Sequence, residues 1–456
     1  MRTRLVLLAS FLVAVPVLAN DNFQSVGTST AVHSAGVKAA AGVPLYFSSG
    51  GAATTKDGVT MREQALANMK RLEANIATAG FTLGDVMFVR AYLTPGADGS
   101  VDYAGWDKAW SEVFNNPKNP NKPARTTVAV PMLNQNGGLI ELEYVCATRD
   151  PAKMAAGSRA LALPVTNPNL TPYGTKEGRI YAGMGIMPGS GLYWTSGNNP
   201  PVINKDAPLT SYENRGDMHT QAHNTLVLLK DNLAGVGLTL ADVVYVRAFL
   251  GPDGNMGGKF DFDGWNKAYS EFFNTPEQPH KPARVTATTP TFAGNAGGQP
   301  NTMIEIEFVA AFPKAPALFD GPGAVGPPHT LLRDYGASTA MVASGIAVKP
   351  GAALYLSEGA LPTGGGDMKT QALSTLESLK SHLAEAGASF RDVVFLRAYL
   401  VPGADGSVDR DGWNAAYTTF FNNPGQPHKP ARVTIPVSSL PKSDSKIAID
   451  LIAVVP

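Results

Sequence analysis

One stretch of sequence is written three times in this chain. Each copy starts at Asp-Val with an apolar run, passes through a Gly-Trp pair and ends in Lys-Pro-Ala-Arg. The final arginines lie about 150 residues apart, which is the size of a small domain and far beyond the period of about 20–50 residues in solenoid repeats. The sequence therefore predicts three tandem copies of one domain, with the shared stretch at Asp85–Thr126, Asp242–Val285 and Asp392–Val433.

Each copy predicts the same order of elements, β-β-α-β-α-β-β. In the first copy, Thr60 is a candidate N-cap, and Leu66, Met69, Leu72 and Ile76 recur at helical spacing after it. The elements expected there are strands near 33–39 and 44–49, a helix over 61–79, a strand over 85–93, a helix over 106–114, and strands over 126–130 and 139–147. The helices expected in the other copies are 217–234, 265–273, 367–386 and 413–421.

Both faces of the predicted strand at 85–93 are mostly apolar. Met87, Val89, Ala91 and Leu93 alternate with Val86, Phe88, Arg90 and Tyr92. Two helices can cover only one face of a sheet. We therefore expect the three sheets to pack on one another around a pseudo-threefold axis, which predicts an α+β fold and a monomer with internal symmetry.

The predicted domain boundaries follow the repeats. We expect domains at 25–150, 173–313 and 329–456. The segments 150–172 and 314–328, rich in proline or glycine, read as linkers.

Residues 1–19 read as a cleaved secretory signal. Arg2 and Arg4 precede an apolar run from Leu5 to Leu18, and Ala19 closes a small-residue cleavage site. The alternative is an uncleaved anchor, but the run is short for a membrane span. We therefore expect a periplasmic or secreted protein with no stable membrane association. Cys146 is the only cysteine, which excludes an intramolecular disulfide.

The charge balance argues against a nucleic-acid partner. Lys+Arg and Asp+Glu both number 37, so the formal net charge is zero. Nucleic-acid binding depends on a basic face that displaces counterions from phosphates. A ribonuclease is therefore disfavoured.

Several short motifs in the repeats resemble the RidA/YjgF family of reactive-intermediate deaminases. The motifs are a Ser-Gly after an early strand, a Gln near the start of the first helix, Pro-Ala-Arg before a late strand, and Glu-x-Glu in the last strand. Their residues here are Ser49-Gly50 and Ser196-Gly197; Gln64, Gln221 and Gln371; Arg125, Arg284 and Arg432; and Glu141 with Glu143 and Glu305 with Glu307.

The resemblance implies three RidA-type, chorismate-mutase-like domains that form an intrachain pseudo-trimer, with ligand sites in the clefts between them. It also implies hydrolysis of 2-imino or enamine acids to 2-oxo acids and ammonia. In that role Arg125, Arg284 or Arg432 holds the substrate carboxylate, because a guanidinium binds carboxylates bidentately. Glu141 or Glu305 orients the attacking water, and a glycine allows close approach of the ligand.

The catalytic candidates are Glu141 and Glu305. The substrate-binding candidates are Arg125, Arg284, Arg432, Ser49, Gly50, Ser196, Gly197 and Gly359. Arg125 grouped with Glu141, and Arg284 with Glu305, are the main support for an enzyme. Nothing in this chemistry calls for a metal or an organic cofactor, and the expected partner is a small carboxylate.

The third repeat departs from the pattern. Ala448 stands where the first two repeats have Glu141 and Glu305, and Glu358 stands before Gly359 in place of a serine. We expect a carboxylate at 358 to lie near Arg432 and to occupy or repel the anion position. We therefore expect at most two sites that are able to carry out the reaction. The family's early aromatic residue has no clear match, and His33 and Tyr181 fall near its place.

Several residues have alternative interpretations. The candidate arginines and glutamates could hold strands together without binding a ligand. Arg90, Arg247 and Arg397, with Glu143, Glu307 and Asp450, read as buried or interfacial pairs. His219 and His223 have metal-ligand spacing but no evident third ligand, and His280 and His428 read as surface or cleft-rim residues. The alternative to an exported deaminase is a non-catalytic binding protein for small carboxylates.

Overall fold

The computed structural model describes residues 23–26, 34, 36–39, 41–43, 45–78, 80–133, 137–147, 170–173, 183–187, 189–292, 301–312, 329–335, 341, 343 and 345–456. The predicted signal segment, the linker at 314–328, most of the linker at 150–172, and both His33 and Tyr181 lie outside these residues. None of the helices in these ranges is both long and apolar enough to cross a membrane.

The first repeat contains β1 (Phe23–Val26), β2 (Gly36–Ala39), β3 (Leu45–Ser48), β4 (Gly51–Ala52), α1 (Met61–Thr78), β5 (Val86–Leu93), α2 (Tyr103–Val113), β6 (Ala124–Ala129) and β7 (Ile140–Ala147). The second contains β8 (Leu170–Tyr173), β9 (Gly183–Ile186), β10 (Gly191–Thr195), α4 (Tyr212–Arg215), α5 (Met218–Gly235), β11 (Val243–Leu250), α6 (Phe262–Phe272), β12 (Ala283–Thr288) and β13 (Ile304–Phe312). The third contains β14 (Leu332–Tyr335), β15 (Gly345–Val348), β16 (Ala353–Ser357), α8 (Met368–Glu385), β17 (Val393–Leu400), α9 (Arg410–Phe420), β18 (Ala431–Pro436) and β19 (Ile447–Val455).

The α+β repeat order predicted from the sequence is confirmed, but the second helix of each repeat starts three residues before its predicted start. The cause is an aspartate N-cap that the sequence interpretation overlooked. The side chains of Asp102, Asp261 and Asp409 accept hydrogen bonds from the backbone amides of Gly105, Gly264 and Gly412. The predicted cap of α1 is present, since the amide of Glu63 donates to Oγ1 of Thr60 over 3.2 Å.

The described strands form three sheets that share strands between repeats. Their orders are β6-β5-β7-β3-β9-β8, β12-β11-β13-β10-β15-β14 and β18-β17-β19-β16-β2-β1, with β4 beside β7 in the first. Strand β2 of the first repeat thus pairs with β16 of the third repeat. The alternating burial of this strand explains the pairing, because Val37 and Ala39 enter the central core with Leu354 and Leu356. The boundaries 25–150, 173–313 and 329–456 stay predictions, and the sheets cross them.

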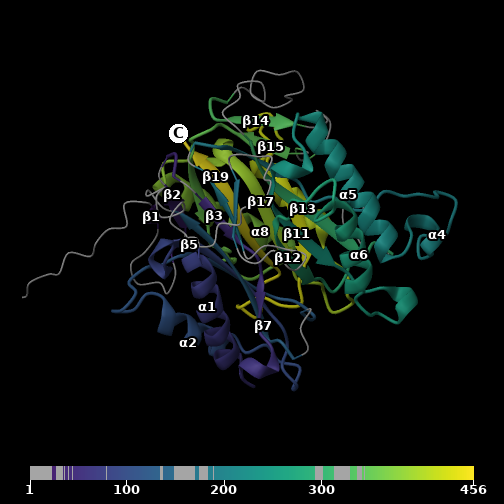
Figure 1. The fold of residues 1–456 in the computed structure, drawn as a ribbon, viewed down its shortest axis with the longest axis horizontal. Helices are drawn as coiled ribbons and strands as arrows, with labels where there is room; N and C mark the ends of the chain where they lie inside the picture. The colour runs from purple at the N-terminus through teal and green to yellow at the C-terminus, as the bar shows by residue number, and fades with distance from the viewer. Residues whose placement is uncertain are drawn as a thin grey trace, which may run out of the picture.

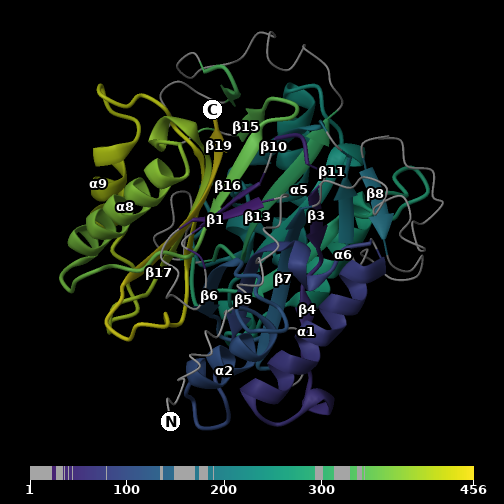
Figure 2. The same cartoon turned by 90° about the vertical axis from the view of Figure 1, so that its left-hand side faces the viewer.

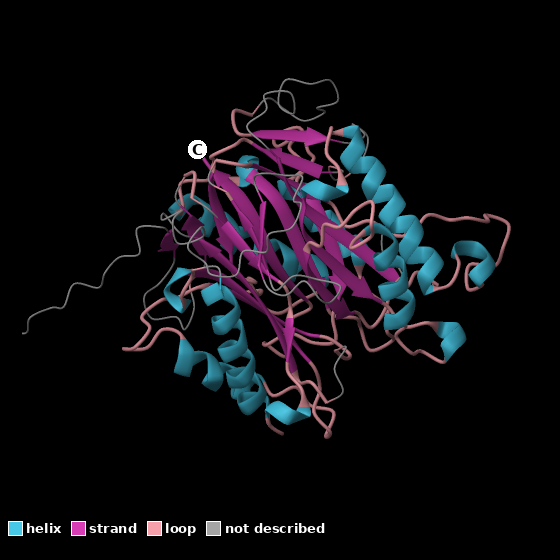
Figure 3. Cartoon of the chain, viewed as in Figure 1, coloured by secondary structure: helices cyan, strands magenta, loops and turns pink. Residues whose placement is uncertain are grey.

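The helix pairs lie on the outside and the sheets lie inside, as Figures 1 and 3 show. Figure 2, turned by 90°, shows α8 and α9 covering the outer side of β17 and β19. Each helix pair shares an apolar cluster with one sheet. A fourth cluster contains residues of all three repeats and lies between the sheets, as expected from strands that are apolar on both faces.

The alternation predicted for β5 holds only from Phe88 onward. Val89, Ala91 and Leu93 face the helices, but Met87 lies in the central cluster beside Phe88. A shift in register between Val86 and Phe88, where β5 pairs with β7, accounts for the change, because a bulge inserts one residue and reverses the side-chain direction.

Candidate functional site

Two hydrogen bonds, one from a glycine amide and one to a serine hydroxyl, join two repeats at each of two places. At a third place only the glycine hydrogen bond is present. We call these places junctions. Junction 1 joins Ser49-Gly50 to Arg284, junction 2 joins Ser196-Gly197 to Arg432, and junction 3 joins Glu358-Gly359 to Arg125. In each, the amide of the glycine donates to the carbonyl oxygen of the arginine, over 3.1, 3.2 and 3.1 Å. Each junction is therefore made of two different repeats.

In junction 1, the Ser-Gly pair holds the strand that carries Arg284. The amide of Arg284 donates to Oγ of Ser49 over 3.0 Å. A Cβ atom at Gly50 would lie 2.0 Å from Oε1 of Glu141 and 2.7 Å from Cγ2 of Val285. Glycine is thus needed there to let the Glu141 carboxyl group reach the junction between the repeats.

Glu141 is buried, with 6% of its surface exposed. Burial, reinforced by the neighbouring Glu143, raises its pKa to about 8 although Arg284 acts in the opposite direction. The carboxyl group is therefore mainly protonated at pH 7. A titration near neutral pH suits a group that exchanges protons with water or substrate.

Junction 2 repeats this arrangement. The amide of Arg432 donates to Oγ of Ser196 over 2.9 Å, and a Cβ at Gly197 would lie 2.0 Å from Oε1 of Glu305. Burial raises the pKa of Glu305 to about 8, against the opposing effects of Arg410 and Arg432. Junction 2 therefore contains a second guanidinium, that of Arg410.

The three junction arginines lie over aromatic rings of the second helix in their own repeat. The guanidinium carbon lies 5.0 Å from the ring centre of Trp110 for Arg125, 4.4 Å from Tyr269 for Arg284, and 4.5 Å from Tyr417 for Arg432. Cation–π contact fixes the direction of the side chain while leaving donors for a carboxylate. The helix residue three positions before each ring also contacts the arginine at junctions 1 and 3.

Junction 3 differs from the others in every polar group except its arginine. Nη2 of Arg125 donates to Oδ1 of Asp107 over 2.7 Å, whereas Nη2 of Arg284 donates to the neutral Oδ1 of Asn266 over 2.9 Å. Glu358 replaces the serine, and Ala448 replaces the glutamate of the first two repeats and is buried. Burial lowers the pKa of Arg125, opposed by Asp107 and Glu358. Arg125 already faces carboxylates of the protein itself.

The structure corrects the grouping expected from the sequence. Arg284 lies with Glu141, and Arg432 lies with Glu305, so each pair comes from two repeats. Arg125 faces the altered third repeat, and Glu358 acts on Arg125 rather than on Arg432. The Ser-Gly residues Ser49, Gly50, Ser196, Gly197 and Gly359 all lie at the junctions. Connectivity between repeats could not be read from the motifs, because each repeat carries half of two sites.

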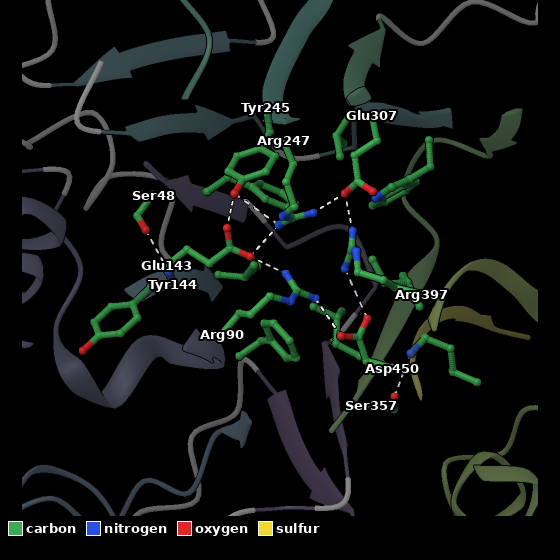
Figure 4. Close-up of a pocket in the computed structure, with 18 residues that line it drawn as sticks. Ser48, Arg90, Glu143, Tyr144, Tyr245, Arg247, Glu307, Ser357, Arg397 and Asp450 are labelled. Atoms are coloured by element: carbon green, nitrogen blue, oxygen red, sulfur yellow. Dashed lines mark hydrogen bonds and ion pairs between the residues drawn. The ribbon is translucent and has the colours of Figure 1, made fainter. Parts of the chain in front are cut away.

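A ring of ion pairs joins residues of the three repeats around one pocket (Figure 4). Arg90 bonds to Glu143 and Asp450, Arg247 to Glu143 and Glu307, and Arg397 to Glu307 and Asp450. Burial alone would raise the pKa of Glu143, but Arg247 and Arg90 hold it below its ordinary value. The ring surrounds a cavity of about 40 Å³. The prediction of buried, interfacial pairs is confirmed.

The histidines noted in the sequence have structural contacts. Nε2 of His280 and of His428 bonds to the carbonyl oxygen of Val243 and of Val393. Both rings are buried, so the predicted surface or cleft-rim position is wrong. His219 and His223 both contact Glu271 at 2.7 Å. Within the described ranges no group of three or more His, Cys, Asp or Glu side chains is arranged to hold a metal ion.

Two residues that shape the junctions were missed. Asp107 takes the place of Asn266 and Asn414, and Arg410 takes the place of Tyr103 and Phe262. Their signal was present in the repeats, since the aligned segments DYAGWD, DFDGWN and DRDGWN differ at three positions and these are two of them. A comparison of the copies position by position would have marked them.

The fold and the junctions define a class of protein that builds paired Arg and Glu sites between copies of one small α+β domain. Comparison with known sequences agrees. The profile of the family described as Endoribonuclease L-PSP matches residues 28–148 and 338–455, about half of the chain. The chain therefore belongs to this family, the RidA/YjgF family whose resemblance the motifs indicated.

Individual relatives match over single repeats. A RutC family protein of Pyrococcus abyssi is 40% identical over 88 residues, 19% of this chain and 62% of the relative. One of Pyrococcus horikoshii is 39% identical over 88 residues, 19% of this chain and 63% of the relative. The chain thus spans about three fifths of the length of these relatives.

Solved structures match in the same way. E. coli TdcF with bound serine is 27% identical, covering 30% of this chain and 94% of TdcF at a TM-score of 0.21. A YjgF family member from Neisseria meningitidis is 21% identical, covering 28% and 98% at a TM-score of 0.20. Scores of this size add nothing to the fold described above.

Proposed function

We propose that this protein hydrolyses small 2-imino or enamine acids to 2-oxo acids and ammonia at junctions 1 and 2. The observation that carries the proposal is a buried glutamate with a pKa near 8, placed beside a glycine and facing an arginine of the next repeat. Family membership supports the same chemistry.

The residues have distinct roles in the proposed reaction. Arg284 or Arg432 binds the substrate carboxylate, with its side chain oriented by the aromatic ring beneath it. Glu141 or Glu305, in its ionised form, accepts a proton from the water that attacks the imine carbon. The glutamate passes this proton to the imine nitrogen, which gives a neutral carbinolamine. It then accepts the proton of the carbinolamine hydroxyl and delivers it to the amino nitrogen as the carbon–nitrogen bond breaks, so that ammonia leaves and the carbonyl of the 2-oxo acid forms.

Junction 3 is proposed to be inactive. It lacks the glutamate, and Asp107 bonds to its arginine at 2.7 Å. The number of working sites is then two, which agrees with the upper limit expected from the sequence.

A non-catalytic protein that binds small carboxylates is the second candidate. The observation that favours it is junction 3, where an arginine persists without a glutamate. We also propose export, on the basis of the basic and apolar start of the chain. N-terminal mass spectrometry of the mature protein should place the first residue near Asn20.

The test of the proposed reaction is release of 2-oxo acid from imines generated in situ by an amino-acid oxidase. Wild type should exceed the spontaneous rate, and Glu141→Gln/Glu305→Gln should not. If wild type does not exceed the spontaneous rate but binds 2-oxobutyrate by calorimetry, the binding protein is the correct reading.

A further inference from the structure

The first residue of the second helix differs among the three repeats. It is Tyr103 in α2, Phe262 in α6 and Arg410 in α9, each directly after the capping aspartate. In the first repeat this position points across to the neighbouring repeat, since the hydroxyl of Tyr103 lies 3.1 Å from Oγ of Ser439. Ser439 belongs to the third repeat, which supplies Gly359 to junction 3. The position therefore faces a neighbouring repeat.

Arg410 brings donors to junction 2 that have no acceptor in the described protein. Its Nε and Nη2 atoms are buried and make no hydrogen bond to any described residue, and the same holds for Nη1 of Arg432. Both arginines interact electrostatically with Glu305. Burial lowers the pKa of Arg410 to about 10, which still leaves it charged at neutral pH. Two guanidinium groups with buried donors thus converge beside one carboxyl group.

The three junctions differ in the charge of their buried side chains. At pH 7 Glu141 and Glu305 are mainly protonated, because their pKa values lie near 8. Arg284 then leaves junction 1 with one positive charge, and Arg410 and Arg432 leave junction 2 with two. In junction 3 the carboxylates of Asp107 and Glu358 oppose the single charge of Arg125. At the position of Arg410 the second repeat, which supplies Arg284 to junction 1, has the uncharged Phe262, which packs on the apolar cluster of that repeat.

We infer that junction 2 is specific for dicarboxylic substrates, with Arg432 holding the carboxylate next to the reacting carbon and Arg410 holding the second one. Junction 1 takes monocarboxylic substrates with an apolar side chain. This inference rests on the proposed function, since it assigns a substrate class to each of the two sites. One chain then serves two classes of 2-imino acid, one class at each junction.

The inference is tested by equilibrium binding, which does not depend on catalysis. Arg284→Ala removes the carboxylate-binding arginine of junction 1. Isothermal calorimetry of this full-length variant then measures ligand binding at junction 2. The probes are 2-oxoglutarate, a 2-oxo diacid, and 2-oxobutyrate, a 2-oxo monoacid. Because a charge-assisted hydrogen bond changes an affinity by about tenfold or more, 2-oxoglutarate should bind at least about tenfold more tightly. Adding Arg410→Phe should abolish this preference, and Arg410→Lys should keep part of it.

The phenylalanine at 410 is the residue that the second repeat carries at this place, and thermal melting verifies that the variant folds. The reciprocal change provides an independent test. In an Arg432→Ala background, Phe262→Arg should give junction 1 a preference for 2-oxoglutarate.

Each outcome decides between the claims. Equal affinities of Arg284→Ala for the two probes, or a preference that survives Arg410→Phe, overturn the inference and leave the proposed function standing. Absence of binding to junction 2 while wild type still hydrolyses imines also overturns the inference alone. Absence of both binding and hydrolysis in wild type overturns the proposed function as well.

Discussion

The backbone amide of Gly50 in the first repeat donates a hydrogen bond to the carbonyl oxygen of Arg284 in the second, over 3.1 Å. This contact sets Glu141, which comes from the repeat of Gly50, opposite the arginine of another repeat. The candidate site is therefore a property of the junction between two repeats.

Gly50→Ala should remove the activity of junction 1. The added methyl group would meet Oε1 of Glu141 at 2.0 Å and Cγ2 of Val285 at 2.7 Å, so the carboxyl group must move away from its place. Hydrolysis of a monocarboxylic 2-imino acid, the substrate class assigned to junction 1, should fall toward the spontaneous rate, and hydrolysis of a dicarboxylic one at junction 2 should persist. Gly235→Ala is the matched control, because nothing lies within 4 Å of a Cβ at that helix end. Full activity of Gly50→Ala would contradict the placement of Glu141.

The rate of hydrolysis should rise with pH and level off above about pH 8. The ionised glutamate is the proton acceptor, and the pKa values of Glu141 and Glu305 lie near 8. A pH–rate profile of a substrate that does not titrate in this range measures the effect. A rate that instead falls as the pH rises through 8 would assign the working form to the protonated acid.

The same pKa values make folding stability depend on pH. The folded chain retains these two protons up to about pH 8, whereas the unfolded chain releases them near the ordinary value of 4.5. Their contribution to stability is therefore full below pH 4.5 and is lost as the pH rises toward 8. Urea unfolding between pH 5 and 8 should show this decline in wild type and a shallower one in Glu141→Gln/Glu305→Gln. Identical slopes would show that the carboxyl groups are not protonated when folded.

The triple variant Asp107→Asn/Glu358→Ser/Ala448→Glu should create a third site at junction 3. Asparagine leaves Arg125 uncompensated, serine restores the contact seen at Ser49, and glutamate restores the acid. In calorimetry, 2-oxobutyrate should bind Arg125 only after the first two changes, and hydrolysis there should require the third. The test is made in an Arg284→Ala/Arg432→Ala background, where Arg125 is the remaining junction arginine. No binding in this background would mean that junction 3 is closed by its shape.

Arg247→Ala should destabilise the protein by about 3–5 kcal/mol, because it removes one of the two arginines that Glu143 and Glu307 each contact and leaves the buried ring one positive charge short. The free energy of unfolding in urea measures the loss. Arg62→Ala breaks the exposed pair with Glu112 and is the matched control, with little change expected. If the two variants lost equal stability, the central ring would not hold the repeats together.

The sequence predicted the repeat, the order of elements and the residue types that meet at the junctions, because each of these is a local pattern that recurs along the chain. It did not predict which arginine lies beside which glutamate. Arg284 and Glu305 share a repeat yet lie at different junctions, and only the packing of the sheets decides this. The exchange of β2 into the third sheet was likewise missed, since pairing over such a separation leaves no local signal.

The most direct test of the cross-repeat site compares two double variants in the imine hydrolysis assay. Arg284→Ala/Glu141→Ala removes both halves of junction 1 and should retain the activity of junction 2. Arg284→Ala/Glu305→Ala damages both junctions and should fall to the spontaneous rate. The reverse result, with activity kept only when Arg284 and Glu305 are removed together, would show that each site lies within one repeat and would contradict this account.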